Sequence, residues 1–326
     1  MRAVVVQSPG GTEVLSVGTR PVPEPAAGDL LIDVAAAGVN FIDVYHRQGI
    51  YPMPTPFVLG VEGAGTVVAI GDDTAEFGVG DRVAWCSVPG SQAERAVVPA
   101  VRAVPVPDGV AFDVAAAAML QGMTAHYLVN STYAVQPGDA VLVHAAAGGV
   151  GQLLVQMAAA KGARVIATAS TEHKRNKARA AGAGAVVDYT RHDDPQSLAD
   201  AVRAANEGAG VRVAYDGVGR ATFEASLRSL APRGMVALFG GASGQVEPLD
   251  LMRLSQLGSL FVTRPTLVHY TATREELLDR AADVFGQLTA GALQIEIGGH
   301  YDLDDAARAY HDLEGRRTTG KLILVP

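Results

Sequence analysis

The chain has 326 residues, a formal net charge of −8 and 48% hydrophobic residues, which together allow two domains of ordinary size with complete cores. Its basic residues are scattered rather than gathered in a stripe, so we expect no nucleic-acid partner. The single cysteine, Cys86, excludes an internal disulfide and a multi-cysteine metal cluster, and it is consistent with a reducing compartment. The first residues turn polar too early for a signal peptide, and no apolar stretch is long enough to span a bilayer. We therefore expect a cytoplasmic protein without a membrane partner.

Residues 1–123 are predicted to form a small, mainly β domain of barrel type. Short apolar runs separated by Pro, Gly and Asp predict its strands. The clearest of them are Ala3–Val6, Leu30–Val34, Gly65–Ile70 and Arg82–Ala84. One segment, Gly38–Pro54, departs from this pattern, because a helical turn and a loop there carry many polar side chains without an evident packing reason.

Residues 124–264 are predicted to form a second domain of alternating strands and helices. A segment rich in Ala, Leu and Met, Asp113–Val129, predicts one or two helices at the crossing into it. Alternation from Ala140 onwards predicts a parallel, doubly wound sheet with helices on both faces. Strands are expected at 140–144, 163–168, 185–188, 211–215, 234–239 and 259–263, and helices near 151–161, 173–181, 197–206 and 221–230.

Residues 265–326 do not continue this alternation, and we expect them to pack back on the first domain. The predicted elements are a helix at Arg274–Ala290, a strand at Gln294–Ile297, a helix at Leu303–Leu313 and a strand at Lys321–Val325.

The turn after the first strand of the second domain is the strongest functional signal. The strand leads into Ala145-x-x-Gly148-x-x-Gly151, after which a helix begins. Free backbone N–H groups and the helix dipole make such a helix start an anion site. Gly148 would let the backbone approach a pyrophosphate, and Gly151 would let helix and strand pack closely. Close packing without a ligand is the alternative interpretation of the same pattern.

The second strand of this domain indicates which nucleotide the turn would bind. An Asp or Glu at its tip would select NAD, whereas a cation nearby would accommodate a 2′-phosphate. The tip after Thr168 is small and uncharged, and Lys174 and Arg175 lie in the first turn of the next helix. These two cations could instead be solvated helix charges, and Glu172 is the rival acidic candidate. The pattern favours NADP.

Taken together, the two halves resemble the zinc-free quinone oxidoreductases of the medium-chain dehydrogenase/reductase superfamily, of the ζ-crystallin type. The resemblance covers essentially the whole chain, and several motifs occur in one order at long separations. They are Gly38–Asp43, Gly60–Gly65, Gly80–Val83, Gln121–Thr124, His144–Gly151, Tyr215–Gly219, Gly258–Pro265 and Thr319–Lys321. The resemblance implies an α/β fold with a GroES-like, mainly β catalytic domain, a Rossmann domain, and an active site in the cleft between them.

The resemblance also implies an NADPH site built from both halves. Its expected members are Asn40, Phe41, Ile42, Asp43, Tyr45, Thr124 and Tyr127 at the nicotinamide end; Ala147, Gly148, Gly149 and Val150 at the pyrophosphate; Ser170, Lys174 and Tyr189 around the 2′-phosphate; and Val218, Phe239, Gly240, Gly241, Val262, Thr263, Arg264 and Arg316 along the cleft. Plain packing roles remain an alternative for Asn40 and Tyr127.

No metal is expected. A catalytic zinc needs three protein ligands, commonly including a cysteine and a histidine. Asn40 matches the cysteine position of the zinc-containing relatives, and Val61-Glu62 matches their His-Glu pair. The segment that matches their structural zinc lobe, Pro89–Val97, holds no cysteine.

The expected reaction is hydride transfer from NADPH to a quinone. Such an acceptor delocalises the arriving charge, so position and a few hydrogen bonds suffice. Asn40 and Tyr51 are the candidate donors near the acceptor carbonyl, and Asp43 would organise the loop. The alternatives are a 2-alkenal or enoyl-thioester reductase and, in another class, a non-enzymatic NADPH-binding structural or regulatory protein. We also expect a homodimer, because the last Rossmann strand, within Gly258–Thr263, would otherwise be an exposed apolar edge.

Overall fold

The computed structural model describes all residues from Met1 to Pro326, and they divide into two compact units. Unit 1 contains residues 1–123 and 271–326, and unit 2 contains residues 124–270. The chain therefore leaves unit 1 once and returns to it once, and the C-terminal segment belongs to the same unit as the N-terminal residues.

The return to unit 1 comes after Tyr270, later than the position after Arg264 that the sequence suggested. A short helix, α8 (Leu267–Tyr270), still belongs to unit 2. Its last ring stacks on Tyr127 with centroids 4.2 Å apart and an interplanar angle of 7°. The Tyr270 hydroxyl also accepts a hydrogen bond from Thr132 at 2.9 Å. These contacts hold the segment on unit 2.

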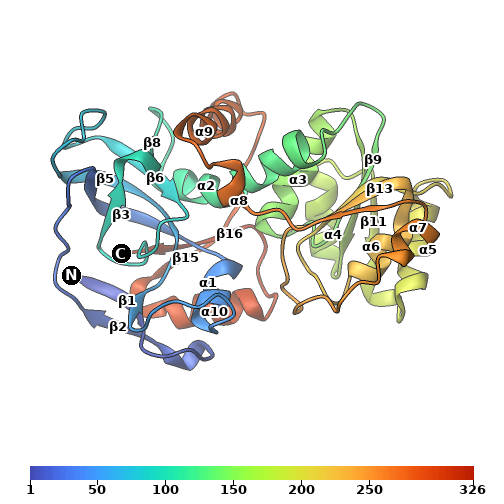
Figure 1. The fold of residues 1–326 in the computed structure, drawn as a ribbon, viewed down its shortest axis with the longest axis horizontal. Coiled ribbons are helices and arrows are strands. Elements are labelled where there is room, and N and C mark those ends of the chain that lie inside the picture. Colours follow the sequence, from blue (N-terminus) through green and yellow to red (C-terminus); the bar gives the residue numbers. More distant parts are fainter. The chain divides into compact units, whose positions relative to one another are not determined.

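Unit 1 is mainly β. Strands β15, β16, β3, β5, β6 and β8 follow one another in a sheet that β7 joins by pairing with β3, and β2, β1 and β4 form a smaller sheet (Figure 1). The strands are β1 (Arg2–Val6), β2 (Leu15–Thr19), β3 (Asp29–Val39), β4 (Phe57–Val58), β5 (Glu62–Ile70), β6 (Arg82–Cys86), β7 (Arg95–Pro99), β8 (Ala103–Pro105), β15 (Ile297–Asp302) and β16 (Lys321–Val325). The helices are α1 (Phe41–Arg47), α9 (Arg274–Thr289) and α10 (Ala306–Glu314), and α2 (Phe112–Tyr127) begins in unit 1 and ends in unit 2.

The C-terminal strand completes the sheet of unit 1. β16 runs antiparallel to β3, with Leu322 opposite Val39, and its bounds are those that the sequence predicts. The strand predicted at Gln294–Ile297 begins only at Ile297, and this prediction was wrong. The reason is register, because β15 extends to Asp302 by pairing in parallel with β16.

Unit 2 contains the predicted doubly wound sheet. Its strands are all parallel, in the order β11-β10-β9-β12-β13-β14. They are β9 (Ala140–Val143), β10 (Arg164–Ala169), β11 (Ala185–Asp188), β12 (Val211–Asp216), β13 (Leu230–Leu238) and β14 (Phe261–Thr263). The helices are α3 (Gly149–Ala160), α4 (Glu172–Ala180), α5 (Pro195–Ala205), α6 (Phe223–Ser229), α7 (Met252–Gln256) and α8. The strand order reverses at β9, and ligands bind at the carboxyl ends of strands beside such a switch point.

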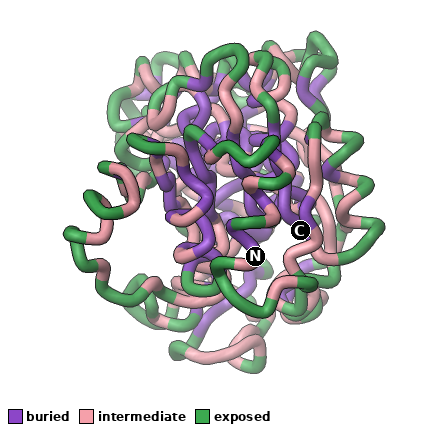
Figure 2. Tube along the Cα trace, turned by 90° about the vertical axis from the view of Figure 1, so that its right-hand side faces the viewer, coloured by how far each residue is buried: buried purple, intermediate pink, exposed green.

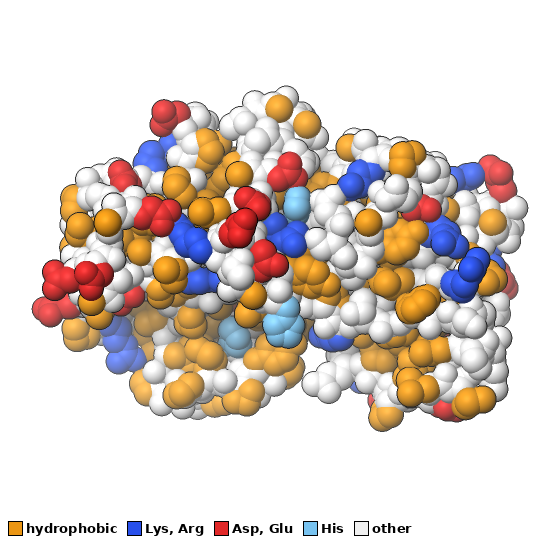
Figure 3. Space-filling view, turned by 45° about the horizontal axis from the view of Figure 1, so that its top comes forward, with side chains coloured by type: hydrophobic (Ala, Val, Ile, Leu, Met, Phe, Trp, Pro, Cys, Tyr) orange, Lys and Arg blue, Asp and Glu red, His pale blue; other side chains and the backbone are white.

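The buried backbone gathers in the interior, and the loops and outer helix faces are exposed (Figure 2). On the face shown in Figure 3, basic and acidic side chains are interspersed. The helix predicted within Asp113–Val129 is α2, which ends in a π-helical turn at Leu128–Thr132. No helix combines the length and the apolar character that crossing a bilayer requires.

Candidate functional site

The glycine turn of unit 2 has the geometry of an anion site. Ala145, which stands where the commoner fingerprint has glycine, adopts the left-handed conformation with φ of +51°. Gly151 has no room for a side chain, because an added Cβ would lie 2.8 Å from the Cα of Ala146 and closer still to the carbonyl of Ala145. Helix α3 therefore packs directly on the turn, as the motif predicts.

The start of α3 fits a pyrophosphate. Gly148 is the N-cap residue, and a Cβ added there would meet only the carbonyl of Ala145, at 3.3 Å. The first amides of the helix, in Gly149–Gly151, belong to the N–H groups that an α-helix leaves without an intrahelical partner. Small residues and unpaired amides at the positive end of a twelve-residue helix suit the diphosphate of a dinucleotide.

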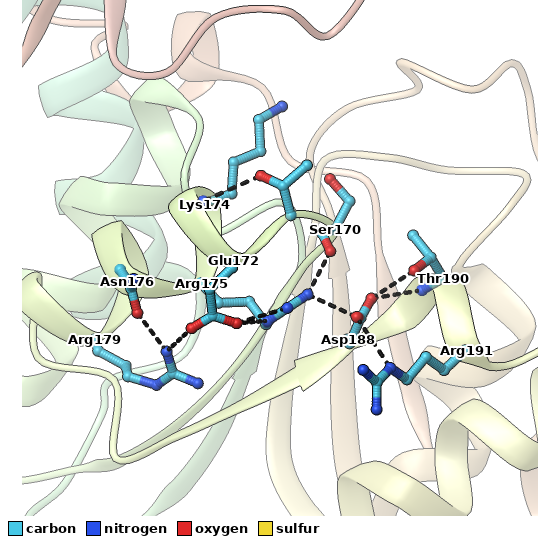
Figure 4. Close-up of polar contacts among 10 residues, drawn as sticks. Ser170, Glu172, Lys174, Arg175, Asn176, Arg179, Asp188, Thr190 and Arg191 are labelled. Carbon is cyan, nitrogen blue, oxygen red and sulfur yellow. Dashed lines mark hydrogen bonds and ion pairs between the residues drawn. The ribbon is translucent and has the colours of Figure 1, made fainter.

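The tip of β10 carries the residues predicted for a 2′-phosphate (Figure 4). Helix α4 is capped by Thr171, whose side chain accepts a hydrogen bond from the backbone N–H of Lys174 at 3.3 Å. The long side chain of Lys174 points away from the charged cluster formed by the neighbouring arginines. Ser170 lies between this lysine and that cluster. No acidic side chain occupies the strand tip itself.

Arg175 has a structural role that the sequence did not reveal. Its guanidinium donates to the carbonyl of Ser170 at 2.5 Å, to Asp188 at 2.6 Å and to Glu172 at 2.7 Å. The hydrogen bonds of Glu172 with Arg175 and Arg179 hold the pKa of that carboxyl below its usual range. Arg175 is thus not a solvated charge, and Glu172 faces arginines rather than the tip of β10 (Figure 4).

Most of the cofactor residues predicted in unit 2 follow carboxyl ends of parallel strands, which form one edge of the sheet. They are Ala147–Val150 after β9, Ser170 and Lys174 after β10, Tyr189 after β11, Val218 after β12, Phe239–Gly241 after β13, and Val262–Arg264 at the end of β14. The Arg264 guanidinium donates to the carbonyls of Leu238 and Gly240 at 2.9 and 2.8 Å, which joins the last two turns. Thr124 and Tyr127 lie on α2, and the ring of Tyr127 is buried against Tyr270.

The remaining predicted residues, Asn40–Tyr45, Tyr51 and Arg316, lie in unit 1. Asn40 precedes α1, and its side chain is buried. The amide oxygen accepts from the Lys321 ammonium at 2.7 Å and from Gln121 at 3.3 Å, while the amide nitrogen donates to Glu62 at 2.8 Å. These bonds set the orientation of the amide. The NH₂ group has two N–H donors, and the bond to Glu62 uses one of them.

Glu62 and Lys321 form a fully buried ion pair beside Asn40. The second oxygen of Glu62 accepts the backbone N–H of Leu120 at 2.5 Å. Sequence reasoning considered Glu62 only as part of a lost zinc site and gave Lys321 no role. A signal for it exists, because a lysine opens the otherwise apolar strand Lys321–Val325.

These residues do not fit a zinc ion. Nowhere in residues 1–326 do three His, Cys, Asp or Glu side chains come together in a group that could hold a metal. The carboxylate of Glu62 is engaged by an ammonium group, and the neighbouring position is the apolar Val61.

Asp43 joins the start of α1 to the C-terminal segment. One carboxyl oxygen accepts from the backbone N–H of Asn40 at 2.8 Å and from the Tyr310 hydroxyl at 2.9 Å. Tyr310 in turn accepts from Gln92 at 2.6 Å. The other oxygen of Asp43 is buried without a partner. Burial raises the pKa of Asp43 to about 7, against the lowering effect of these hydrogen bonds. These contacts attach the start of α1 to Tyr310 of the C-terminal segment.

Tyr51 is separate from this buried cluster. Its side chain is 42% exposed, and its ring packs edge-on against Tyr45 with centroids 5.5 Å apart. Its backbone N–H donates to the carbonyl of Tyr45 at 3.2 Å. The half-buried ring of His46 also lies edge-on to Tyr51, with centroids 6.2 Å apart, and burial lowers the pKa of that imidazole. No hydrogen bond joins Tyr51 to Asn40, so the two predicted donors stand in different surroundings.

A Rossmann unit with an N-terminal mainly β unit, completed by the C-terminal strand, defines a medium-chain dehydrogenase/reductase. Comparison with known families agrees with this class. Residues 26–108 match the alcohol dehydrogenase GroES-like domain, and residues 149–283 match the zinc-binding dehydrogenase domain.

Similar proteins show which family of this superfamily the chain belongs to. A quinone oxidoreductase of Pseudomonas aeruginosa is 44% identical over 319 residues, which are 97% of each chain. A 2-haloacrylate reductase of a Burkholderia species is 39% identical, over 99% of this chain and 98% of the relative. A mycobacterial protein solved in complex with NADPH is 49% identical, covers 100% of both chains and superposes with a TM-score of 0.97. The chain belongs to the quinone oxidoreductases of the medium-chain dehydrogenase/reductase superfamily, and it is an oxidoreductase.

Proposed function

We propose that the protein transfers hydride from NADPH to a quinone without the help of a metal. The observation that carries this proposal is the carboxyl edge of the unit 2 sheet, where the start of α3 fits a pyrophosphate and the uncharged tip of β10 is followed by Lys174. The mycobacterial relative is described as an NADPH complex, and the Pseudomonas relative is named a quinone oxidoreductase.

Backbone amides and side chains of both units take part in the proposed mechanism. NADPH, when bound, supplies the hydride. The amides of Gly149–Gly151 bind the pyrophosphate, and the Lys174 ammonium pairs with the 2′-phosphate. A quinone spreads the arriving negative charge over its ring, so a neutral hydrogen-bond donor suffices at the carbonyl. Asn40, through its remaining N–H, and the exposed phenol of Tyr51 are the proposed donors. Asp43 holds the start of α1 through the Asn40 backbone.

A cofactor and acceptor screen tests this proposal. The absorbance of NADPH and of NADH is followed with 1,4-benzoquinone and with a conjugated enone. We expect NADPH to be consumed with the quinone. Asn40→Ala and Tyr51→Phe should lower turnover while nearly keeping NADPH affinity. A preorganised donor contributes up to about 2.7–4 kcal/mol in a dry site, and an activated quinone should need less. Tyr301→Phe is a matched control, because it removes a tyrosine hydroxyl of unit 1 that donates to Asp312. Normal turnover in both donor variants would reject their role.

Reduction of a conjugated C=C bond is the second candidate, since the Burkholderia relative at 39% identity is named a 2-haloacrylate reductase. NADPH consumption with the enone but not with the quinone would establish it. Tight NADPH binding without turnover on any acceptor would instead indicate a structural or regulatory protein.

We also propose that the protein works as a cytoplasmic homodimer joined through β14. This strand pairs only with β13, so its other edge is open, and Phe261 on it is 57% exposed. The buried free thiol of Cys86 is compatible with a reducing compartment. Sedimentation at micromolar concentration should show a dimer, and Phe261→Glu should give a monomer. A monomeric wild type would reject this interface.

A further inference from the structure

Four buried polar side chains form a continuous hydrogen-bonded chain inside unit 2, and the function described so far uses none of them. They are Thr168 on β10, His144 directly after β9, Ser226 on α6 and Asp216 at the end of β12. His144 Nδ1 lies 3.0 Å from the Thr168 hydroxyl, and Nε2 lies 3.0 Å from the Ser226 hydroxyl. The Ser226 hydroxyl lies 2.8 Å from Oδ2 of Asp216.

The direction of every bond in this chain follows from the carboxylate. A carboxylate oxygen can only accept, so the Ser226 hydroxyl donates to Asp216. Because the hydroxyl hydrogen of Ser226 is used in this bond, the Ser226 oxygen must accept a hydrogen bond from His144. Nε2 of His144 therefore carries a hydrogen atom. Burial lowers the pKa of His144, so the ring is neutral and its Nδ1 is bare. Thr168 must then donate to Nδ1. These directions correspond to the Nε2–H tautomer of His144.

Asp216 also contacts the turns after two further strands, through its carboxylate and through its backbone carbonyl. Its Oδ1 accepts the backbone N–H groups of Val218 and Gly219 at 2.9 and 3.0 Å, and the Thr222 hydroxyl lies 2.8 Å from both carboxylate oxygens. The backbone carbonyl of Asp216 accepts the N–H of Phe239 at 2.9 Å. Asp216 thus contacts the turns that follow β12 and β13.

The other end of the chain reaches the turns after β9 and β10. His144 is the residue before Ala145, which has the left-handed backbone conformation in the glycine turn. The carbonyl of Thr168 accepts the N–H of Ala146 at 3.1 Å, and Thr168 lies two residues before Ser170. One hydrogen-bonded chain therefore joins the turns after four parallel strands, and each of these turns carries residues of the dinucleotide site proposed above.

We propose that Asp216, Ser226, His144 and Thr168 are positioning residues that set the spacing of the dinucleotide-binding turns. Ser226 links Asp216, which contacts the turns after β12 and β13, to His144 and Thr168, which contact the turns after β9 and β10. The inference rests on the proposed binding of NADPH. Burying four polar groups is costly unless all of them are satisfied, and an apolar core would fill the same space. A complete network gives the loops one fixed arrangement, which lowers the ordering needed when the cofactor binds.

Ser226→Ala tests the link, and Ser229→Ala is its matched control. Both serines are fully buried on α6, but the Ser229 hydroxyl donates only to the carbonyl of Ala225 in its own helix, at 2.7 Å. The dissociation constant of NADPH is measured by cofactor fluorescence, and kcat at saturating NADPH. We expect Ser226→Ala to weaken NADPH binding about tenfold, which corresponds to about 1.4 kcal/mol, with kcat nearly kept. Ser229→Ala should bind NADPH like the wild type.

A second measurement determines the directions of the hydrogen bonds in the cofactor-free protein. The ¹⁵N chemical shifts of His144, assigned with a His144→Gln variant, should show the Nε2–H tautomer. In Asp216→Asn the amide oxygen must face the N–H groups of Val218 and Gly219, so the NH₂ group faces Ser226. Every bond then reverses, and His144 should carry its proton on Nδ1. The exchange of tautomers tests the directions of the hydrogen bonds, and the NADPH affinity of Ser226→Ala tests the positioning role.

The outcomes separate the two proposals. No NADPH binding by the wild type would reject the proposed function. NADPH binding that is equal in the wild type and in Ser226→Ala would reject the positioning role alone. The Nδ1–H tautomer in the wild type, or the same tautomer in Asp216→Asn, would overturn the hydrogen-bond directions on which that role depends.

Discussion

Replacing Lys321 by Met should expose how much unit 1 depends on its buried ion pair. Methionine keeps the unbranched side chain up to the position of Cε but removes the ammonium that bonds to Glu62 and, at 2.7 Å, to Asn40. Both members of the ion pair are fully buried. The variant would leave the Glu62 carboxylate inside the protein with only the Leu120 backbone N–H and the Asn40 amide as partners.

The expected loss is about 3–5 kcal/mol in the free energy of unfolding, which is typical for an uncompensated buried charge. This is a large part of the total of about 5–15 kcal/mol that a domain has. Adding Glu62→Gln removes the orphaned charge and keeps an acceptor for Leu120, so the double variant should recover most of the loss. Arg2→Met is a control for an exposed pair in the same unit, since Arg2 bonds to Asp304 on the surface, and it should cost less than about 1 kcal/mol.

Urea unfolding followed by tryptophan fluorescence measures these unfolding free energies for unit 1, which contains the ion pair. Trp85 is the only tryptophan, is fully buried on β6, and pairs with Gly63, the residue after Glu62. Lys321→Met should also lower quinone turnover while keeping NADPH affinity, because the Asn40 amide loses its fixed orientation. A loss below about 1 kcal/mol for Lys321→Met, or a double variant no more stable than the single one, would refute the reasoning.

Three further predictions concern charge, cofactor and metal. Asp43 has a pKa of about 7 in the folded protein, above its value in the unfolded chain, so folding favours its protonated form. Its contribution to the free energy of unfolding is present below about pH 4 and is lost as the pH rises to about 7, by about 4 kcal/mol at most. Asp43→Asn should reduce this dependence of the unfolding free energy on pH, measured by urea unfolding at several pH values. An unchanged pH dependence would contradict the prediction. Lys174→Ala should weaken NADPH binding by about one to two decades and leave NADH unaffected, with Lys177→Ala on the same helix as control; equal wild-type affinities for NADPH and NADH would reject the assignment. Prolonged chelation should leave quinone reduction unchanged and metal analysis should find no stoichiometric zinc, whereas activity lost on chelation and restored by zinc would overturn the metal-free mechanism.

The sequence by itself determined the parts of this protein that depend on local pattern. Alternating apolar runs predicted the six strands of unit 2, and the Ala145–Gly151 spacing predicted the turn that the start of α3 forms. Strand order in a doubly wound sheet then follows from general topology, which brings the predicted residues after those strands to one edge. The bounds of β16 were also predictable, because an apolar run between a glycine and the C-terminal proline is a strong signal.

Only the tertiary structure decided how polar side chains pair. Lys321 and Asn40 are 281 positions apart in the chain, and His144 and Ser226 are 82 apart. Arg175 was ambiguous in sequence and proved to be the partner of Asp188. Hydrophobic periodicity reports which face of an element is buried, but it carries no information on which distant group will meet a buried charge. Strand register and helix packing determine such partners. Register in turn depends on neighbouring strands: β15 pairs with β16 and therefore forms later in the chain than its own sequence predicted.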